Sequence, residues 1–143
     1  MLRKLKQAGL DKDDLLTVYK GYIRPCIEYA APLWHAGLTQ GQVNHLEKIQ
    51  KRVCRCILSF NYTNYHEALV TLNLQSLQER RNHLCREFAR KASASLKFSR
   101  WFTPSDNCSG MQLRKPTKFR PFKIKTNRFK FSPLPYLTNL LNT

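Results

Sequence analysis

The sequence of residues 39–57 is TQGQVNHLEKIQKRVCRCI, which has the pattern of an amphipathic helix. A capping box opens it, with Thr39 as the N-cap and Gln42 placed to reach back to the Thr39 backbone. At 100° per residue the apolar side chains share one face: Val43, Leu46, Ile49, Val53, Cys56 and Ile57. Four basic side chains lie together on the opposite face: Lys48, Lys51, Arg52 and Arg55. The stretch therefore predicts one helix with an apolar face for a core and a concentrated basic face.

A long apolar run precedes this helix. Acidic side chains, which suit the positive end of a helix dipole, stand at its start: Asp11, Asp13 and Asp14. Apolar side chains cover most of the circumference over residues 15–34, which predicts the central and most buried helix. Pro25 lacks an amide hydrogen and clashes with the preceding turn, so we expect a kink or break near Arg24. Pro32 is expected to loosen the last turn, and Gly37 to end the helix.

Two further helix starts follow. Asn64 with Glu67 indicates an N-cap for a short helix through Leu72. Ser76 with Glu79 forms a second capping box. Its helix is expected to bury Leu77, Leu84, Cys85, Phe88 and Ala92 and to expose Arg80, Arg86, Arg90 and Lys91. Residues 1–100 thus predict an all-α fold, an irregular bundle of four to five helices.

The composition changes near residue 101. Residues 101–143 carry eight Lys and Arg but one acidic residue, Asp106, and phenylalanines are interleaved with the basic side chains. We expect residues 104–126 to be loop or disordered, with short strand character, and residues 133–141 to form a short C-terminal helix. The predicted domains are therefore a helical domain over residues 1–100 and a basic, aromatic, partly disordered tail over residues 101–143.

The charge of the whole chain indicates its partners. Lys and Arg number 25 against 9 Asp and Glu, which gives a formal net charge of +16. A surplus of this size points to polyanions, with nucleic acid first and an acidic membrane surface second. The hydrophobic fraction of 42% excludes a chain that is disordered over most of its length, and five glycines exclude a collagen-like polymer.

Targeting and membrane segments are not apparent in the sequence. The longest apolar stretch, residues 26–34, is interrupted by Glu28 and Pro32 and is too short to span a bilayer. No apolar segment follows the basic N-terminus as it would in a signal peptide. We therefore expect an intracellular protein, nuclear or cytoplasmic and not secreted, with no membrane partner.

No constellation of residues predicts catalysis or a metal site. Two Cys/His pairs are spaced i, i+2 on predicted helices, where side chains point in nearly opposite directions and cannot chelate one ion: Cys54 with Cys56, and His83 with Cys85. The five cysteines are expected to be reduced and mostly buried as small apolar residues. The carboxylates Asp13 and Asp14 are explained by the helix dipole rather than by metal binding. We expect no catalytic residue, no metal and no cofactor.

The remaining signal consists of two basic helix faces and a basic tail. Each face alone is most simply a solvated surface. Because two faces and the tail coincide, we favour contacts to nucleic-acid phosphates without readout of bases. The expected contact residues are Lys48, Lys51, Arg52, Arg55, Arg80, Arg86, Arg90 and Lys91, with Arg81 beside them.

Several strings of residues resemble one protein family, in that family's order. Residues 15–35, LLTVYKGYIRPCIEYAAPLWH, resemble the region directly after the catalytic palm of non-LTR retrotransposon (LINE-type, jockey-like) reverse transcriptases. Similar strings continue over residues 46–55, 65–77, 79–81, 84–91, 128–129 and 132–142. The resemblance spans nearly the whole chain.

This resemblance implies a thumb and post-thumb region of an RNA-directed DNA polymerase. In the family this region packs beside the palm and helps to hold the template–primer duplex. The implied partners are an RNA or DNA duplex, bound without sequence preference, and a reverse transcriptase palm. The family's palm, with its aromatic-x-Asp-Asp metal site, and its endonuclease domain would precede Met1. We therefore expect a truncated remnant that binds nucleic-acid backbones and is inactive by itself.

Two other functions stay open at this point. The chain is alternatively a small helical protein–protein interaction module, with an apolar patch formed by Leu5, Tyr22, Trp34 and Trp101. It is alternatively a translated relic without a present function.

Overall fold

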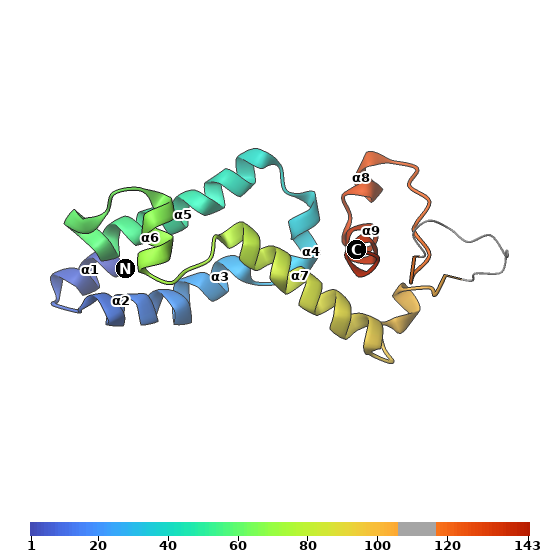
Figure 1. The fold of residues 1–143 in the computed structure, drawn as a ribbon, viewed down its shortest axis with the longest axis horizontal. Coiled ribbons are helices and arrows are strands. Elements are labelled where there is room, and N and C mark those ends of the chain that lie inside the picture. The colour runs from blue at the N-terminus through green and yellow to red at the C-terminus, as the bar shows by residue number, and fades with distance from the viewer. Residues whose placement is uncertain (106–116) are drawn as a thin grey trace. The chain divides into compact units, whose positions relative to one another are not determined.

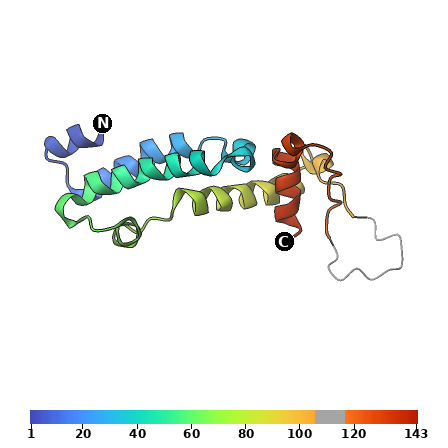
Figure 2. The same cartoon turned by 90° about the horizontal axis from the view of Figure 1, so that it is seen from above.

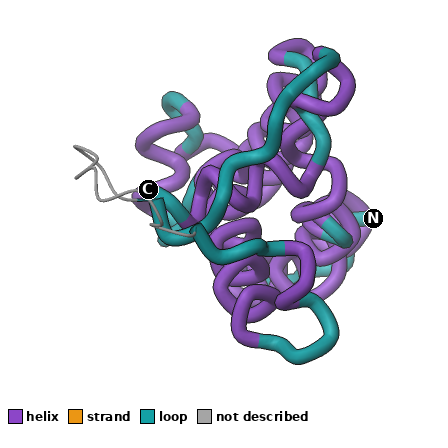
Figure 3. The backbone as a smooth tube through the Cα atoms, turned by 90° about the vertical axis from the view of Figure 1, so that its right-hand side faces the viewer, coloured by secondary structure: helices purple, strands orange, loops and turns teal. Residues whose placement is uncertain are grey.

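The computed structural model describes residues 1–105 and 117–143, and every regular element in these ranges is helical (Figures 1 and 3). This confirms the predicted all-α fold and the short helix near the C-terminal end. None of the described helices is both long enough and apolar enough to cross a membrane. Part of the loop predicted over residues 104–126 falls on residues 106–116, which lie outside the described residues.

The chain divides into two compact units. The first comprises Met1–Tyr29 and Thr39–Arg80, and the second comprises Ala30–Leu38 and Arg81–Thr143. The domains 1–100 and 101–143 stay a prediction. The compact units follow a different division, because the chain leaves the first unit after residue 29, returns to it at residue 39 and leaves it again within one helix.

The first unit is built around one core. Its helices are α1 (Leu2–Gln7), α2 (Lys12–Val18), α3 (Arg24–Glu28), α5 (Gln40–Leu58) and α6 (Tyr65–Thr71). The long helix α5 contacts α1, α2 and α6, and Figure 2 shows α2 and α5 side by side. The core consists of Leu2, Leu15, Tyr19, Val53, Cys54, Ile57, Leu58, Ala68, Leu72 and Leu74. Burial of Leu2 in this core fixes α1 against the C-terminal part of α5, which is what positions the site described below.

A π-helical stretch, Tyr19–Ile23, joins α2 to α3. The break predicted near Arg24 corresponds to this change of helix type, which directly precedes the turn that holds Pro25. A widened turn accommodates a residue whose missing N–H and bulky ring disrupt the i→i−4 pattern.

The prediction of a central, most buried helix over residues 15–34 is wrong. The helix ends at Glu28, and Ala30 adopts a left-handed φ of 51°. Pro32 lies in the first turn of a new short helix, α4 (Ala31–Trp34), rather than loosening the last turn of an old one. The reason is that Pro32 has no N–H to donate to the Glu28 carbonyl. A short 3₁₀ turn, His35–Gly37, then ends the segment as Gly37 predicted.

Helix α5 begins as predicted but buries a different face. The Thr39 N–H donates to Gln42 Oε1 at 2.9 Å, which is one half of the predicted capping box. Ile49, expected in the core, is 42% exposed. Gln50 and Cys54 are buried in its place, so the buried face is rotated toward two residues that the apolar pattern did not include.

Gln50 is buried because two partners satisfy its amide. The Tyr19 hydroxyl donates to Gln50 Oε1 at 2.8 Å, and Gln50 Nε2 donates to the Gln75 carbonyl at 2.8 Å. A buried amide without such partners would cost about 1–3 kcal/mol. The two bonds therefore tie α5 to the π-helical stretch and to the segment that precedes α7.

The second unit contains α4, all but the first turn of α7 (Leu77–Ala94), α8 (Asn127–Lys130) and α9 (Pro133–Leu141). Its core consists of Cys85, Ala89, Ala92, Phe102, Phe119 and Leu137. Asn142 holds the returning chain, because its side chain accepts from the Phe119 N–H and donates to the Phe119 carbonyl, both at 2.9 Å. The predicted strand character is limited, within the described ranges, to an isolated bridge between Pro104 and Phe119.

The cap and most of the buried face of α7 are as predicted. Ser76 and Glu79 exchange the two hydrogen bonds of a capping box, each 3.2 Å long. Leu77, Cys85 and Ala92 are buried as expected. Leu84 and Phe88 are only half-buried.

Candidate nucleic-acid interface

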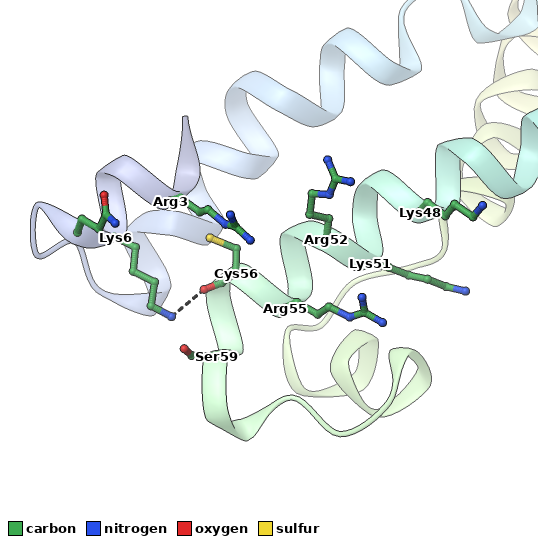
Figure 4. A pocket seen from close by; sticks show the side chains of 9 residues that line it. Arg3, Lys6, Lys48, Lys51, Arg52, Arg55, Cys56 and Ser59 are labelled. Carbon is green, nitrogen blue, oxygen red and sulfur yellow. Dashed lines mark hydrogen bonds between the residues drawn. The ribbon is translucent and has the colours of Figure 1, made fainter.

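The basic face of α5 forms one wall of a pocket of about 780 Å³, and α1 contributes the other wall (Figure 4). Its lining residues are Arg3, Lys6, Gln7, Lys48, Lys51, Arg52, Arg55, Cys56 and Ser59. Six of these nine side chains are basic and none is acidic. The structure thus brings all four residues of the predicted α5 stripe together and adds two cations from the N-terminal helix.

Lys6 anchors α1 to the end of α5. Its ammonium donates to the carbonyl oxygens of Cys56 at 2.7 Å and Ile57 at 3.2 Å. These carbonyls belong to the last turn of α5, where backbone oxygens have no partner within the helix and where a cation is favoured by the helix dipole. Arg3 lies one turn before Lys6 and therefore shares its face of α1. Figure 4 shows both side chains projecting from α1 toward the end of α5.

Sequence reasoning missed Arg3 and Lys6 as site residues. Their i, i+3 spacing places them on one face of a helix, which was the available signal. The approach of that face to Cys56, fifty positions along the chain, is a tertiary contact that no local pattern reveals.

Two tyrosines flank the α5 stripe. The Lys51 ammonium lies 5.0 Å from the centre of the Tyr65 ring, and the Arg55 guanidinium lies 5.2 Å from the centre of the Tyr62 ring. Both distances are in the range of cation–π contacts. The Tyr65 hydroxyl donates to Glu47 at 2.5 Å, and burial together with this bond raises the pKa of Tyr65. These contacts restrain the long basic side chains without neutralising their charge.

Within residues 1–105 and 117–143, the six cations of the pocket form no ion pairs, although Glu47 lines an adjoining hollow with Lys48 and Lys51. Lys48, Arg52, Arg55 and Arg3 are exposed to solvent, while Lys6 and Lys51 are half-buried. A concave surface lined by charges of one sign raises the local concentration of counter-ions of the opposite sign. The site is therefore suited to a polyanion.

Arg80 lies outside this pocket and already has a partner. Its Nε is 2.6 Å from Glu28 Oε1, and its Nη2 donates to Glu28 Oε2 at 3.1 Å. The hydrogen bonds to Glu28, a carboxylate that is 9% exposed, raise the pKa of Arg80. Bidentate pairing of this kind fixes the guanidinium plane. Arg80 therefore joins the first turn of α7 to α3 and is the least suited of the predicted contact residues to meet a phosphate.

The remaining predicted residues of α7 belong to the second unit. Arg90 lies 3.0 Å from Glu87 in an exposed pair, and Arg86 and Lys91 are exposed. These three do not line the α5 pocket. Their role as phosphate contacts stays a prediction.

The prediction that Arg81 contacts phosphates is wrong, because the Arg81 side chain is fully buried. It lies on the same face of α7 as Cys85 and Ala89, which belong to the core of the second unit. Its guanidinium is 6.0 Å from the centre of the Trp34 ring. In the sequence, Arg81 directly follows Arg80, and nothing in that pair of arginines indicates that the second one is buried.

The cysteines and the N-terminal aspartates occupy positions that their packing and helix capping explain. Cys54 and Cys85 are buried as predicted, and burial raises the pKa of each thiol to about 11. Cys26 is exposed, and Cys108 lies outside the described residues. Asp11 caps α2 by accepting the Asp14 N–H at 2.8 Å. Asp13 and Asp14 lie in the first turn of α2, as the dipole interpretation predicted. In the part of the chain that the structure describes, no three His, Cys, Asp or Glu side chains gather as a metal site.

Comparisons with family models, with curated proteins and with solved structures find no match for this chain.

Proposed function

We propose that this chain is the thumb-type, nucleic-acid-binding region of a non-LTR retrotransposon reverse transcriptase. In this proposal the α1–α5 pocket holds the phosphate backbone of a template–primer duplex, RNA or DNA, without reading its sequence. The main support for this proposal is the α1–α5 pocket, which is lined, within the described residues, by six basic residues and by no acidic residue. The resemblance of residues 15–35 and 46–55 to that family supports the assignment, because the second string contains the α5 stripe.

The geometry supports binding to backbones rather than to base edges. Lysine and arginine side chains contact phosphates regardless of sequence, and contacts of this kind supply most of non-specific affinity. Within the described residues, the acidic side chains nearest the N-terminus, those of Asp11, Asp13 and Asp14, serve the start of α2. We assign no step of polymerisation to this chain; in the proposal a reverse transcriptase palm is its partner.

Binding measured over a salt series tests the proposal. Fluorescence anisotropy of a labelled RNA–DNA hybrid and a labelled DNA duplex gives the observed association constant at each salt concentration. If all six cations meet phosphates, log K against log salt has a slope of about −5, and affinity falls about 10³-fold between 50 and 200 mM salt. A slope near zero, or no binding at low salt, contradicts the proposal.

A second candidate function is docking of another protein. It is favoured by one observation in the first unit: Tyr22 and Tyr29 are 73% and 80% exposed and lie seven positions apart, with the exposed Cys26 between them. Tyr22 lies in the π-helical stretch and Tyr29 directly follows the end of α3, so both exposed rings belong to one segment of the first unit. Two members of the patch predicted from sequence do not contribute free apolar surface, because Leu5 packs against the core and Trp34 is half-buried. Association that is insensitive to salt in sedimentation experiments would favour this candidate over the first.

A further inference from the structure

Phe60 is fully exposed, at 102% of the reference accessibility of a phenylalanine. It lies in the 3₁₀ turn Ser59–Asn61, directly after the end of α5. Burying a phenylalanine side chain normally stabilises a fold through the hydrophobic effect, and the exposed ring of Phe60 makes no such contribution. Leu58, two residues earlier, is buried in the core of the first unit, whereas the Phe60 ring takes no part in that core.

The turn begins at a strained backbone position. Ser59 has φ 52° and ψ −114°, in the half of the map that non-glycine residues avoid. Such a conformation is strained and persists only where the surrounding structure enforces it. Ser59 also lines the cationic pocket (Figure 4), so the residue next to Phe60 in the chain belongs to the proposed backbone site.

The surroundings of Phe60 fit a nucleobase better than a protein surface. Both of its neighbours, Ser59 and Asn61, are exposed and polar. A single ring is far smaller than a specific protein interface, which buries at least about 1,000 Å². A single ring does match the area of one base, and bases stack on aromatic side chains whatever their identity.

We infer that Phe60 is a stacking platform for an unpaired base, so that the pocket binds, besides a duplex, a single-stranded polynucleotide with its phosphates on the α5 cations and one base on Phe60. The inference rests on the proposed function, because the pocket supplies the backbone contacts. It adds a preference for nucleic acid with unpaired bases, which the cations alone do not provide. Single-stranded nucleic acid is bound by a positively charged groove combined with aromatic rings. Here Ser59, the residue directly before Phe60, lines the cationic pocket at the end of α5.

The test compares the intact chain with Phe60→Ala, Phe60→Trp and the matched control Leu96→Ala, which also truncates an exposed apolar side chain (95% exposed). The probes are a single strand of about 12 nucleotides and a blunt duplex of the same length, because single-strand sites cover roughly 4–16 nucleotides. We expect Phe60→Ala to weaken single-strand binding about tenfold, since one stacked base contributes about 1–3 kcal/mol. Blunt-duplex binding and the salt slope should not change, because stacking releases no counter-ions. Phe60→Trp should retain the affinity, and its indole fluorescence should be quenched by the single strand.

The outcomes separate this inference from the proposed function. Salt-dependent binding of the unmodified chain with no effect of Phe60→Ala on the single strand overturns the inference and leaves the backbone proposal standing. An equal loss for single strand and duplex also overturns it, because stacking on an unpaired base cannot explain an effect on a blunt duplex. Absence of binding to either probe overturns both proposals. A Phe60→Ala variant that loses self-association, with binding to both probes unchanged, identifies Phe60 as a protein contact instead.

Discussion

The Lys6 ammonium lies 2.7 Å from the carbonyl oxygen of Cys56, at the point where the N-terminal helix meets the end of α5. This bond satisfies a backbone oxygen that the helix leaves without a partner. It also sets Arg3 beside the basic face of α5, so one contact contributes both to the fold of the first unit and to the charge of its pocket.

Replacing Lys6 by methionine should therefore affect both stability and binding. Loss of a charged hydrogen bond and of its interaction with the helix dipole should lower the free energy of unfolding by about 1 kcal/mol. Lys4→Met, an exposed lysine on the same helix, is the matched control and should change stability much less. Urea denaturation measures both variants, and equal midpoints for the two would show that Lys6 does not anchor α1.

The Tyr19–Gln50–Gln75 chain of hydrogen bonds gives a second prediction. Gln50→Leu leaves the Tyr19 hydroxyl and the Gln75 carbonyl without their partner. The substitution should therefore lower the free energy of unfolding by about 2–3 kcal/mol. Adding Tyr19→Phe removes one of the stranded groups, so the double variant should be less destabilised than the two single variants predict together. Gln78→Leu, at an exposed position, is the control. Strict additivity in the double-mutant cycle would contradict the coupling.

Glu28 and Glu87 offer a comparison between a buried and an exposed ion pair. Glu28→Gln weakens a bidentate pair with Arg80 whose acceptor is 9% exposed, and should destabilise the first unit by about 1–3 kcal/mol. Glu87→Gln removes a pair with Arg90 that is open to solvent, and should have little effect. Thermal denaturation of the two variants at equal salt distinguishes them. A larger effect of Glu87→Gln would mean that the Glu28 pair does not hold α7 to α3.

Alkaline pH should destabilise the first unit. Burial raises the pKa of Tyr19 and of Tyr65 above the ordinary tyrosine value, so near pH 10 and above the folded state keeps protons that the unfolded state loses. The buried Cys54 thiol, whose pKa is raised to about 11, acts in the same direction from about pH 9. Stability therefore falls as pH rises above about 9 and more steeply above about 10, with a slope of up to about 1.4 kcal/mol per pH unit for each group. Unfolding measured between pH 8 and 11 checks the sign. Tyr65→Phe should flatten the decline, whereas Tyr22→Phe, at an exposed tyrosine, should leave it unchanged.

The parts of this fold that could be predicted from sequence are local. The three caps at Thr39, Asn64 and Ser76 were predictable because cap and partner lie three residues apart and their chemistry is specific. The basic stripe of α5 was predictable for the same reason, since helical spacing alone places its members together.

The parts that could not be predicted depend on contacts between distant residues. Gln50 is buried because Tyr19, 31 positions away, supplies a donor. Arg81 is buried although its neighbours Arg80 and Asn82 are not, because the core face of α7 passes through position 81. The pocket itself needed α1 to be placed against α5. Hydrophobic periodicity carries no information on which polar residue will find a buried partner.

The measurement that tests the central claim most directly is the salt dependence of duplex binding by a charge-matched pair of triple variants. One variant carries Lys48→Gln, Arg52→Gln and Arg55→Gln in the pocket, and the other carries Lys12→Gln, Lys97→Gln and Lys125→Gln at exposed positions outside it. Both lose three positive charges. If the pocket holds the backbone, the first variant should have a slope of about −3 in log K against log salt, while the second keeps the slope of about −5. Equal slopes for the two variants would show that net charge alone drives binding, and would contradict the assignment of the α1–α5 pocket as the nucleic-acid site.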